Sequence, residues 1–543
     1  MTKLFRFLNT IEQNFHLGKA TAIIAILTLV SRLMGFVRDL FLASQLGAST
    51  QTDIYFTAFR IPDLIYNLLI LGTLSAAFIP VFTDYYLKNK TEAWRIANSV
   101  LNLGIILVGG LSLIIFVFAK PLVSVVAPGF DDEALQQTVS LTRIFLLSPI
   151  IFTISSVFSS ALISFKKFLW VNSAPLFYNA GIIIGIIFFW PMWGLTGVAL
   201  GVILGAILHA IVQLPQLISL GFQWRPIIAW KNAGVKKVLQ LFLPRVLGLD
   251  ISYVNLIIVS IVGSTLVGGT ISAFNFANNI QSVPLGIFAI STTLAVFPVL
   301  SEEYAKKQYN AFINTFNRAF VRILFFILPL SILMLLLRAH VVRLLLGYGA
   351  CDWTCTITTF DALGLLSISL VAQSLVPLLS RAFYARQNTK IPLFISLVAM
   401  GINGLLSWQL SYGLGIIGIA LGFVIASAFQ LILLMIFLHR EIQSDLKSNK
   451  IIRESDYYIV SSSTKIIISA MISGLVAYGL LYGIALLVDT HTVLGILIQA
   501  GISGIAAVIV YLLLTMWFHI PEAISIRSAL SRTTKYFNVS SVQ

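Results

Sequence analysis

The sequence has few charged residues and few of the residue types that build catalytic or metal sites. Only 10% of its 543 residues are Asp, Glu, Lys or Arg, whereas soluble domains carry about a quarter. It has two cysteines and six scattered histidines, and it contains no GxxxxGK phosphate loop and no HExxH or GxSxG motif. These absences argue against an enzyme, a nucleotide-driven pump and a metal centre, so we expect no catalytic residues, no metal and no cofactor.

Long hydrophobic runs make up most of the chain, which is 58% hydrophobic with a mean hydropathy of +0.96. Only helices or closed barrels satisfy the backbone inside lipid, and a helix needs about 20 apolar residues to cross. Runs of that length fall at 20–46, 52–79, 96–119, 138–164, 169–190, 194–219, 238–263, 269–299, 312–337, 356–380, 391–411, 414–438, 465–488 and 493–518. We therefore predict an all-α polytopic membrane protein with about fourteen transmembrane helices.

The basic residues are unevenly distributed among the predicted loops. The intervening loops hold only Lys120, Arg338 and Arg343, whereas the N-terminus, every second loop and the C-terminus hold most of the 35 Lys and Arg. Loops rich in Lys and Arg stay in the cytoplasm, so both termini are predicted to be cytoplasmic. The net charge of +15 then reflects membrane topology, and we expect no nucleic-acid partner.

An internal repeat is visible at an offset of 218 residues. LSAAFIPVFTDYY (74–86) resembles TTLAVFPVLSEEY (292–304), which aligns Pro80 with Pro298 and Asp84 with Glu302. An offset of six spans preserves orientation and predicts two six-helix lobes related by a parallel repeat. The predicted parts are an N-terminal cytoplasmic segment (1–19), an N-lobe (20–220), a C-lobe (221–440), a cytoplasmic connector (441–464), two final spans (465–518) and a cytoplasmic tail (519–543).

The first two predicted spans carry five charged residues: Arg32, Arg38, Asp39, Asp53 and Arg60. An ionised side chain at mid-bilayer costs about 2.5–3.5 kcal/mol on insertion scales and therefore normally faces a wet cavity or an opposite charge. Three arginines against two aspartates predict a positive cavity and an anionic cargo, and guanidinium binds phosphate well. The alternative is that Arg38–Asp39, Asp53 and Arg60–Asp63 form mutual ion pairs that lock the hairpin, and the two roles can coexist.

The two cysteines lie in the segment CDWTC, at positions 351 and 355, on the predicted outer side. An oxidising compartment allows a disulfide at this spacing. Two free thiols are the favoured interpretation.

Three segments resemble one known family. The run SRLMGFVRDLFLASQLGASTQTDIYFTAFRIPDLI (31–65) resembles the signature of the MurJ/MviN family, the lipid II flippases of the MOP transporter superfamily. PLFYNAGIIIG (175–185) and LLSRAFYARQNTKIP (378–392) are similar to its fifth helix and to the segment before its eleventh helix. The resemblance implies a multi-pass protein of the bacterial inner membrane that acts in peptidoglycan synthesis, cell-wall biogenesis and cell shape.

The resemblance also implies a cargo and the residues that handle it. Lipid II, an undecaprenyl diphosphate bearing a muropeptide, would cross between the lobes, with its tail along a groove beside 465–518. Carried over by position, the headgroup-handling residues are Arg32, Arg38, Asp39 and Asp53, and Arg60 stands where the family often has a basic residue.

The chain departs from the family pattern at several charged positions. Tyr66, Asn67 and Leu71 stand where the family often has charges, and Asn279 replaces an arginine of its eighth helix. Arg245, beside Pro244, either supplies some of the missing charge or snorkels to the membrane surface. The details of the phosphate clamp therefore stay open, with Arg245 and Asn279 as auxiliary candidates.

Three functions are consistent with these observations. The first is outward flipping of lipid II by alternating access, coupled to the membrane potential or to a monovalent cation. The second is export of another polyprenyl-linked glycan or amphiphile. The third is a non-transporting membrane scaffold that recruits cell-wall synthesis enzymes.

Overall fold

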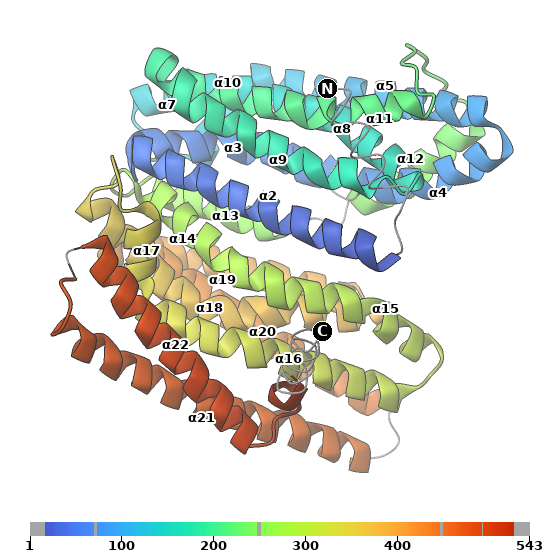
Figure 1. Cartoon of the computed structure of the whole chain (residues 1–543). Helices are drawn as coiled ribbons and strands as arrows, with labels where there is room; N and C mark the ends of the chain where they lie inside the picture. Colours follow the sequence, from blue (N-terminus) through green and yellow to red (C-terminus); the bar gives the residue numbers. More distant parts are fainter. Residues whose placement is uncertain (1–16, 70–72, 247–250, 446–448, 491, 526–543) are drawn as a thin grey trace, which may run out of the picture. The chain divides into compact units, whose positions relative to one another are not determined.

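The computed structural model describes residues 17–69, 73–246, 251–445, 449–490 and 492–525, and all regular secondary structure within them is helical (Figure 1). The residues form two compact units. Unit 1 runs to Ser272 and includes Gly349–Cys351, and unit 2 comprises Ala273–Tyr348 and the residues from Asp352 onward. The all-helical prediction is confirmed for the described residues. Most of the predicted segments 1–19 and 519–543 lies outside them.

Unit 1 contains the helices of the charged hairpin and those that pack around it. They are α2 (Leu17–Leu46), α3 (Thr50–Leu69), α4 (Thr73–Lys88), α5 (Lys90–Val117), α6 (Ala119–Val126), α7 (Asp132–Phe145), α8 (Leu147–Ser164), α9 (Phe168–Ile184), the π-helix η1 (Gly185–Phe189), α10 (Trp190–Ile211), α11 (Leu214–Ser219), α12 (Ala233–Val246) and α13 (Ile251–Gly263). Its largest core cluster is centred on Phe78, Phe82 and Leu162. The repeat in the sequence places a division at 220, whereas α12 packs on α4, and α13 packs on α3 and α6, inside unit 1.

Unit 2 follows from α14 (Thr270–Pro284), whose first residues belong to unit 1. It continues through the π-helix η2 (Leu285–Ile290), α15 (Ser291–Ala305), α16 (Tyr309–Leu336), α17 (Arg338–Leu346), α18 (Trp353–Ala385), α19 (Lys390–Leu414), α20 (Ile416–Asp445), α21 (Asn449–Ala485) and α22 (Val493–Trp517). The Tyr511 hydroxyl donates to the Phe325 carbonyl at 2.7 Å, which joins α22 to α16. Helix α21 begins inside the range predicted as a connector, 441–464.

Within the described residues, ten helical stretches are long and apolar enough to cross a membrane. The stretch Phe168–Ser219 has 52 residues and would measure about 78 Å as one straight helix, more than twice the hydrocarbon thickness. It leaves helical geometry at Gly194 (φ 56°, ψ −140°). The stretch is therefore long enough for two crossings, and the total of about fourteen stays a prediction.

Both units contain a tight helical hairpin that turns at a glycine. Gly194 and Gly415 each adopt φ 56°, a left-handed conformation that glycine reaches without a steric penalty. In unit 1, a Cβ on Gly185 would lie 2.5 Å from the Gly201 Cα, and in unit 2 a Cβ on Gly422 would lie 2.7 Å from a backbone nitrogen of α19. The small residues within 197–206 and 415–428 therefore let the paired helices approach closely.

The units share an order of elements around the sequence repeat. Helices α5 and α16 each have 28 residues. Each follows a proline-containing helix, α4 or α15, and precedes a short one, α6 or α17. The aligned acids also form equivalent ion pairs, Asp84 with Lys88 and Glu302 with Lys306.

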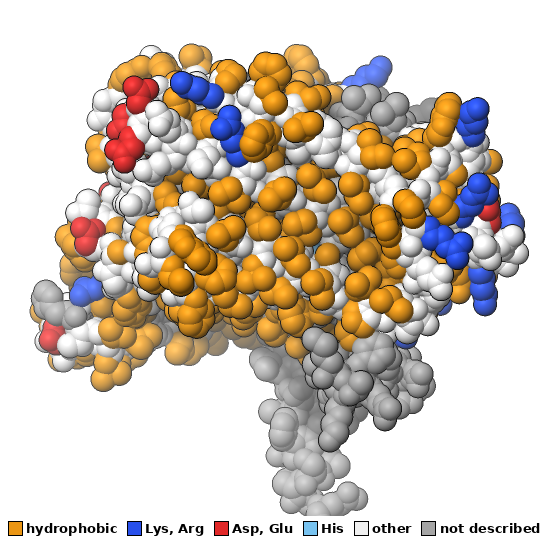
Figure 2. Space-filling view, turned by 90° about the horizontal axis from the view of Figure 1, so that it is seen from above, with side chains coloured by type: hydrophobic (Ala, Val, Ile, Leu, Met, Phe, Trp, Pro, Cys, Tyr) orange, Lys and Arg blue, Asp and Glu red, His pale blue; other side chains and the backbone are white. Residues whose placement is uncertain are grey.

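The surface of the protein is largely hydrophobic on the face shown in Figure 2, with most of the visible Lys and Arg gathered at one end and most of the acidic side chains at the other. Exposed apolar side chains such as Leu113 (65%) and Ile505 (64%) occur in both units. A surface of this kind is stable in lipid and not in water.

Residues 223–229, here called the strap, form an extended segment between α11 and α12 that is bound to α5. Asn98 donates to the Gln223 carbonyl at 3.0 Å and accepts from the Arg225 N–H at 2.8 Å. Asn102 donates to the carbonyls of Arg225 and Ile227 at 2.8 and 2.9 Å. These two buried amides pair backbone groups that have no helical partner.

The two cysteines are disulfide-bonded, and because the chain has only two, the bond joins Cys351 to Cys355. Asp352 accepts a hydrogen bond from the Cys355 N–H at 2.8 Å and caps α18. This cap folds the segment into the first helical turn and brings the two side chains together. The expectation of free thiols was wrong.

Candidate functional site

Arg38 in α2 is held by two neighbours within unit 1. Its Nε and Nη2 donate to Asp39 Oδ1 at 2.9 and 2.7 Å, and its Nη1 donates to Asn179 Oδ1 on α9 at 3.4 Å. The Arg38 side chain stays 24% exposed, whereas that of Asp39 is 7% exposed. Asn179 is itself fixed, because its amide nitrogen donates to the Pro175 carbonyl at 3.0 Å. Arg38 is therefore oriented and still accessible.

Arg60 in α3 is more deeply enclosed, at 6% exposure. Its Nε donates to Ser260 Oγ on α13 at 2.8 Å. Asp63, one turn further along α3, lies within electrostatic range of both Arg60 and Arg38. Both arginines therefore act electrostatically on the same carboxylate. Counting Asp63, the hairpin carries three arginines and three aspartates, so the positive surplus predicted from five residues is not present among these six.

Asp53 has a different environment from the other charged residues of the hairpin. It is 1% exposed, and its two oxygens accept from the backbone N–H groups of Gly269 and Ser272, both at 2.7 Å. These N–H groups lie at the beginning of α14, where unpaired donors and the helix dipole favour a carboxylate. Asp53 therefore caps a helix, and both of its oxygens are already engaged.

Arg32 is exposed on α2 and makes no hydrogen bond or ion pair with any residue in the described part of the chain. Helix α2 runs without a break through Gly35, between Arg32 and Arg38. The structure pairs Arg38 with Asp39 and places Arg38 and Arg60 within electrostatic range of Asp63. We call these four residues the charged cluster, and Arg32 is not part of it.

The two auxiliary candidates are not part of this cluster. Arg245 lies in the last turn of α12, and its side chain is outside the described residues, as is Leu71. Asn279 is half-buried on α14 in unit 2.

Aromatic side chains surround the charged cluster. Tyr55, 4% exposed, packs edge-on against Phe59 and Phe145, with ring centroids 5.0 and 5.8 Å apart. Tyr66 and Tyr178 both pack on Phe152, at 4.9 and 5.2 Å. Tyr55 and Tyr178 also lie within electrostatic range of Arg38, so these rings border the charged cluster.

The positions that depart from the family pattern make local contacts. Tyr66 contributes to the aromatic wall just described. The Asn67 amide donates to the Asp63 carbonyl at 2.8 Å, within α3.

Sequence reasoning missed the polar partners on other helices. Asn179 lies inside a segment that resembled the family, but nothing indicated its contact with Arg38. A buried network that joins α8 to α10 and to the turn after α10 was also missed. Ser155 Oγ lies 2.6 Å from His209 Nδ1, and the Gln213 amide donates to Ser155 Oγ at 2.6 Å. Polar residues inside hydrophobic runs were its only signal. No group of His, Cys, Asp or Glu in the described residues is arranged to hold a metal ion.

Comparison with known proteins gives one family. The family model "Lipid II flippase MurJ" matches residues 42–497. A probable lipid II flippase MurJ of Buchnera aphidicola subsp. Acyrthosiphon pisum is 31% identical over 419 residues, which are 76% of this chain and 81% of the relative. A probable lipid II flippase MurJ of Vibrio cholerae is 28% identical over 436 residues, 78% of this chain and 82% of the relative.

Solved structures show the same fold. A structure described as lipid II flippase MurJ in an inward closed conformation has a TM-score of 0.75 at 23% identity, covering 92% of this chain and 99% of its own. An inward-facing multidrug resistance MATE family transporter of the MOP superfamily has a TM-score of 0.63 at 16% identity, covering 78% of this chain and 99% of its own. These likenesses show that the chain has the fold that these two transporters share. From the family match and the relatives together, the chain belongs to the MurJ family of lipid II flippases.

Proposed function

We propose that this chain flips lipid II from the inner to the outer leaflet by alternating access, with the diphosphate engaged by arginines of the α2–α3 hairpin. The observation that carries the proposal is the family match over residues 42–497, combined with an accessible pair of arginines on α2. A guanidinium is always charged and donates paired hydrogen bonds to phosphate oxygens.

The contacts support different roles for the five charged residues. Arg32 is exposed and unpaired within the described residues, so it is available for the first contact with an anion. Arg38 is 24% exposed, and Asp39 and Asn179 hold it in position. Asp53 and Arg60 are buried against the backbone of residues 269–272 and against Ser260, which favours a structural role. The proposed diphosphate ligands are therefore Arg32 and Arg38.

The architecture supports a rocking transporter. The matching order of elements in the two units, with equivalent ion pairs and glycine turns, supports a parallel repeat. Transporters with such repeats carry substrate between their halves. We extend this to about fourteen spans, cytoplasmic termini and a tail groove beside α21 and α22.

The chain shows no nucleotide-binding motif, which leaves an ion gradient, the membrane potential or downstream consumption of the cargo as sources of energy. A potential that is negative inside favours outward movement of an anion by about 2.3 kcal/mol per charge per 100 mV. We propose coupling to this potential, with a monovalent cation as the alternative driver.

The test is translocation of lipid II in vesicles with an imposed potential, using the wild type and Arg38→Ala, Arg38→Lys and Arg32→Ala. We expect Arg38→Ala to lower the rate at least about tenfold, which corresponds to roughly 1.4 kcal/mol. Arg38→Lys should recover little, because an ammonium lacks the planar pair of donors. The matched control is Arg95→Ala, which removes an exposed positive charge at the start of α5.

Three results would contradict the proposal. If the single variants Arg38→Ala and Arg32→Ala both keep full activity, the arginine mechanism is excluded. Flipping of other polyprenyl-linked glycans in preference to lipid II would favour the alternative cargo. Absence of flipping by wild-type protein that still restores growth to flippase-depleted cells would favour a scaffold that binds cell-wall enzymes.

A further inference from the structure

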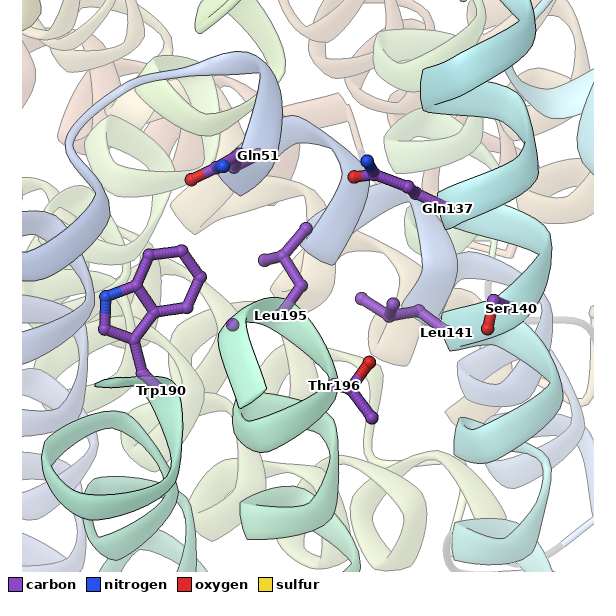
Figure 3. Close-up of a pocket in the computed structure, with 8 residues that line it drawn as sticks. Gln51, Gln137, Ser140, Leu141, Trp190, Leu195 and Thr196 are labelled. Atoms are coloured by element: carbon purple, nitrogen blue, oxygen red, sulfur yellow. The ribbon is translucent and has the colours of Figure 1, made fainter. Parts of the chain in front are cut away.

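A pocket of about 360 Å³ lies in unit 1 at the end where α3 begins (Figure 3). Its wall comes from the first turn of α3 (Gln51), from α7 (Gln137 and Ser140), and from the first turns of α10 (Trp190–Thr196). The helix is interrupted at Gly194, whose φ of 56° and ψ of −140° are not helical. This bend leaves open space beside Trp190, and the residues of the charged cluster around Arg38 do not line it.

The pocket presents hydrogen-bonding groups that the protein does not use. Within the described residues, the Gln51 amide, the Ser140 and Thr196 hydroxyls and the Trp190 indole N–H make no hydrogen bond. Gln137 uses its amide nitrogen for a 3.2 Å contact along α7 and leaves its oxygen available. In Figure 3 the Gln137 amide points toward the side of the pocket where Gln51 lies, whereas the Gln51 amide points away from Gln137, on the side of Trp190. The wall of the pocket therefore carries several donors and acceptors.

The composition of this wall restricts the class of ligand. No Asp, Glu, Lys or Arg lines the pocket, so it lacks a counter-charge for a phosphate, a carboxylate or a metal ion. An acyl chain would leave the polar groups without water or partners, which is unfavourable. A flat indole beside amides and hydroxyls suits a sugar ring, whose C–H face packs on the aromatic surface while its hydroxyl and acetamido groups form hydrogen bonds.

We propose that this pocket binds an uncharged N-acetylated sugar. Trp190 supplies the packing surface, the glutamines bind the acetamido and hydroxyl groups, and Ser140 and Thr196 bind the ring hydroxyls. The volume lies at the small end of ligand sites, about 300–1,000 Å³, which suits a small saccharide. The predicted topology places the pocket on the outer side. This assignment rests on the proposed function: the bound sugar belongs to the headgroup of the cargo after it has crossed the membrane. A free saccharide is the other source of the same chemistry.

The first experiment measures binding by calorimetry on the full-length purified protein, with N,N′-diacetylchitobiose as the probe and maltose as the comparison sugar. We expect the acetylated disaccharide to bind better than maltose. Trp190→Leu and Gln51→Leu should each weaken binding about tenfold by removing packing area or hydrogen bonds. The matched control is Trp193→Leu, which removes a tryptophan three residues away that is 52% exposed and does not line the pocket. Gln51 is exposed, so its variant should fold normally.

Equal binding of chitobiose by Trp190→Leu, Gln51→Leu and the wild type would overturn the proposal, as would no binding by the wild type. The second experiment measures flipping of polyprenyl diphosphates with and without a disaccharide. If the pocket serves the cargo, the two variants slow only the sugar-bearing lipid. If binding falls but flipping does not, the headgroup assignment is overturned and a free saccharide is the ligand. If wild-type protein flips neither lipid, the proposed function fails, while calorimetry still decides on the pocket.

Discussion

Replacing Asp53 with asparagine tests whether this residue caps a helix or handles cargo. Both carboxylate oxygens accept backbone N–H groups, from Gly269 and Ser272, at 2.7 Å, and the side chain is 1% exposed. Asparagine keeps one acceptor oxygen and turns an NH₂ group toward the other N–H. A hydrogen bond to a buried charged group contributes about 1.5–3 kcal/mol. We therefore expect Asp53→Asn to lower the free energy of unfolding by about 2–3 kcal/mol.

The matched control is Asp131→Asn at the start of α7. Asp131 is exposed and caps its helix with a single bond, from the Ala134 N–H to Oδ1 at 2.8 Å. Asparagine is about as good an N-cap as aspartate, so the expected loss is below about 0.5 kcal/mol. Both variants are measured by tryptophan fluorescence during denaturant unfolding in one detergent.

The assignment is refuted if Asp53→Asn is no less stable than Asp131→Asn. A variant with wild-type stability and slow flipping would instead place the Asp53 carboxylate on the cargo. Loss of stability, with flipping reduced only in proportion to folded protein, would support the cap.

Three further outcomes are expected. Gly185→Ala should destabilise the protein by about 1–3 kcal/mol in thermal unfolding, because its Cβ would lie 2.5 Å from the Gly201 Cα. The control Gly110→Ala, whose Cβ meets nothing within 4 Å, should be neutral or slightly stabilising. Equal effects of the two variants would contradict the close packing of Gly185 on Gly201. Cys351 and its partner should resist maleimide labelling in native protein until a reductant is added, whereas labelling without reductant would exclude the disulfide. Asn102→Ala removes the hydrogen bonds to two carbonyls of the strap. Because the strap should then open more often, trypsin should cleave it at least about threefold faster. An unchanged rate of cleavage would contradict the anchoring of the strap by Asn102.

Much of the fold was predictable from the sequence, because lipid restricts the choices available to the backbone. Hydrophobic runs of spanning length had to become helices. The short helices α6 and α17 were not foreseen, since they lie in loops with little periodicity. The strap was also not foreseen, because its backbone partners are Asn98 and Asn102, more than 120 residues earlier.

The free-thiol expectation failed for a related reason. Spacing alone does not decide whether two cysteines meet. The Asp352 cap, which starts α18 between them, decides that they do.

By itself, the sequence determined the membrane class, the family and the presence of charged residues in the first hairpin, because composition, hydropathy and motifs are local properties. Only the tertiary structure decided which of those charges stay accessible. Arg38 meets Asn179, Arg60 meets Ser260, and Asp53 binds the backbone at Gly269. Each contact joins residues more than 100 positions apart, and which side chains meet across such distances depends on the helix faces that pack together, a choice that no local pattern encodes.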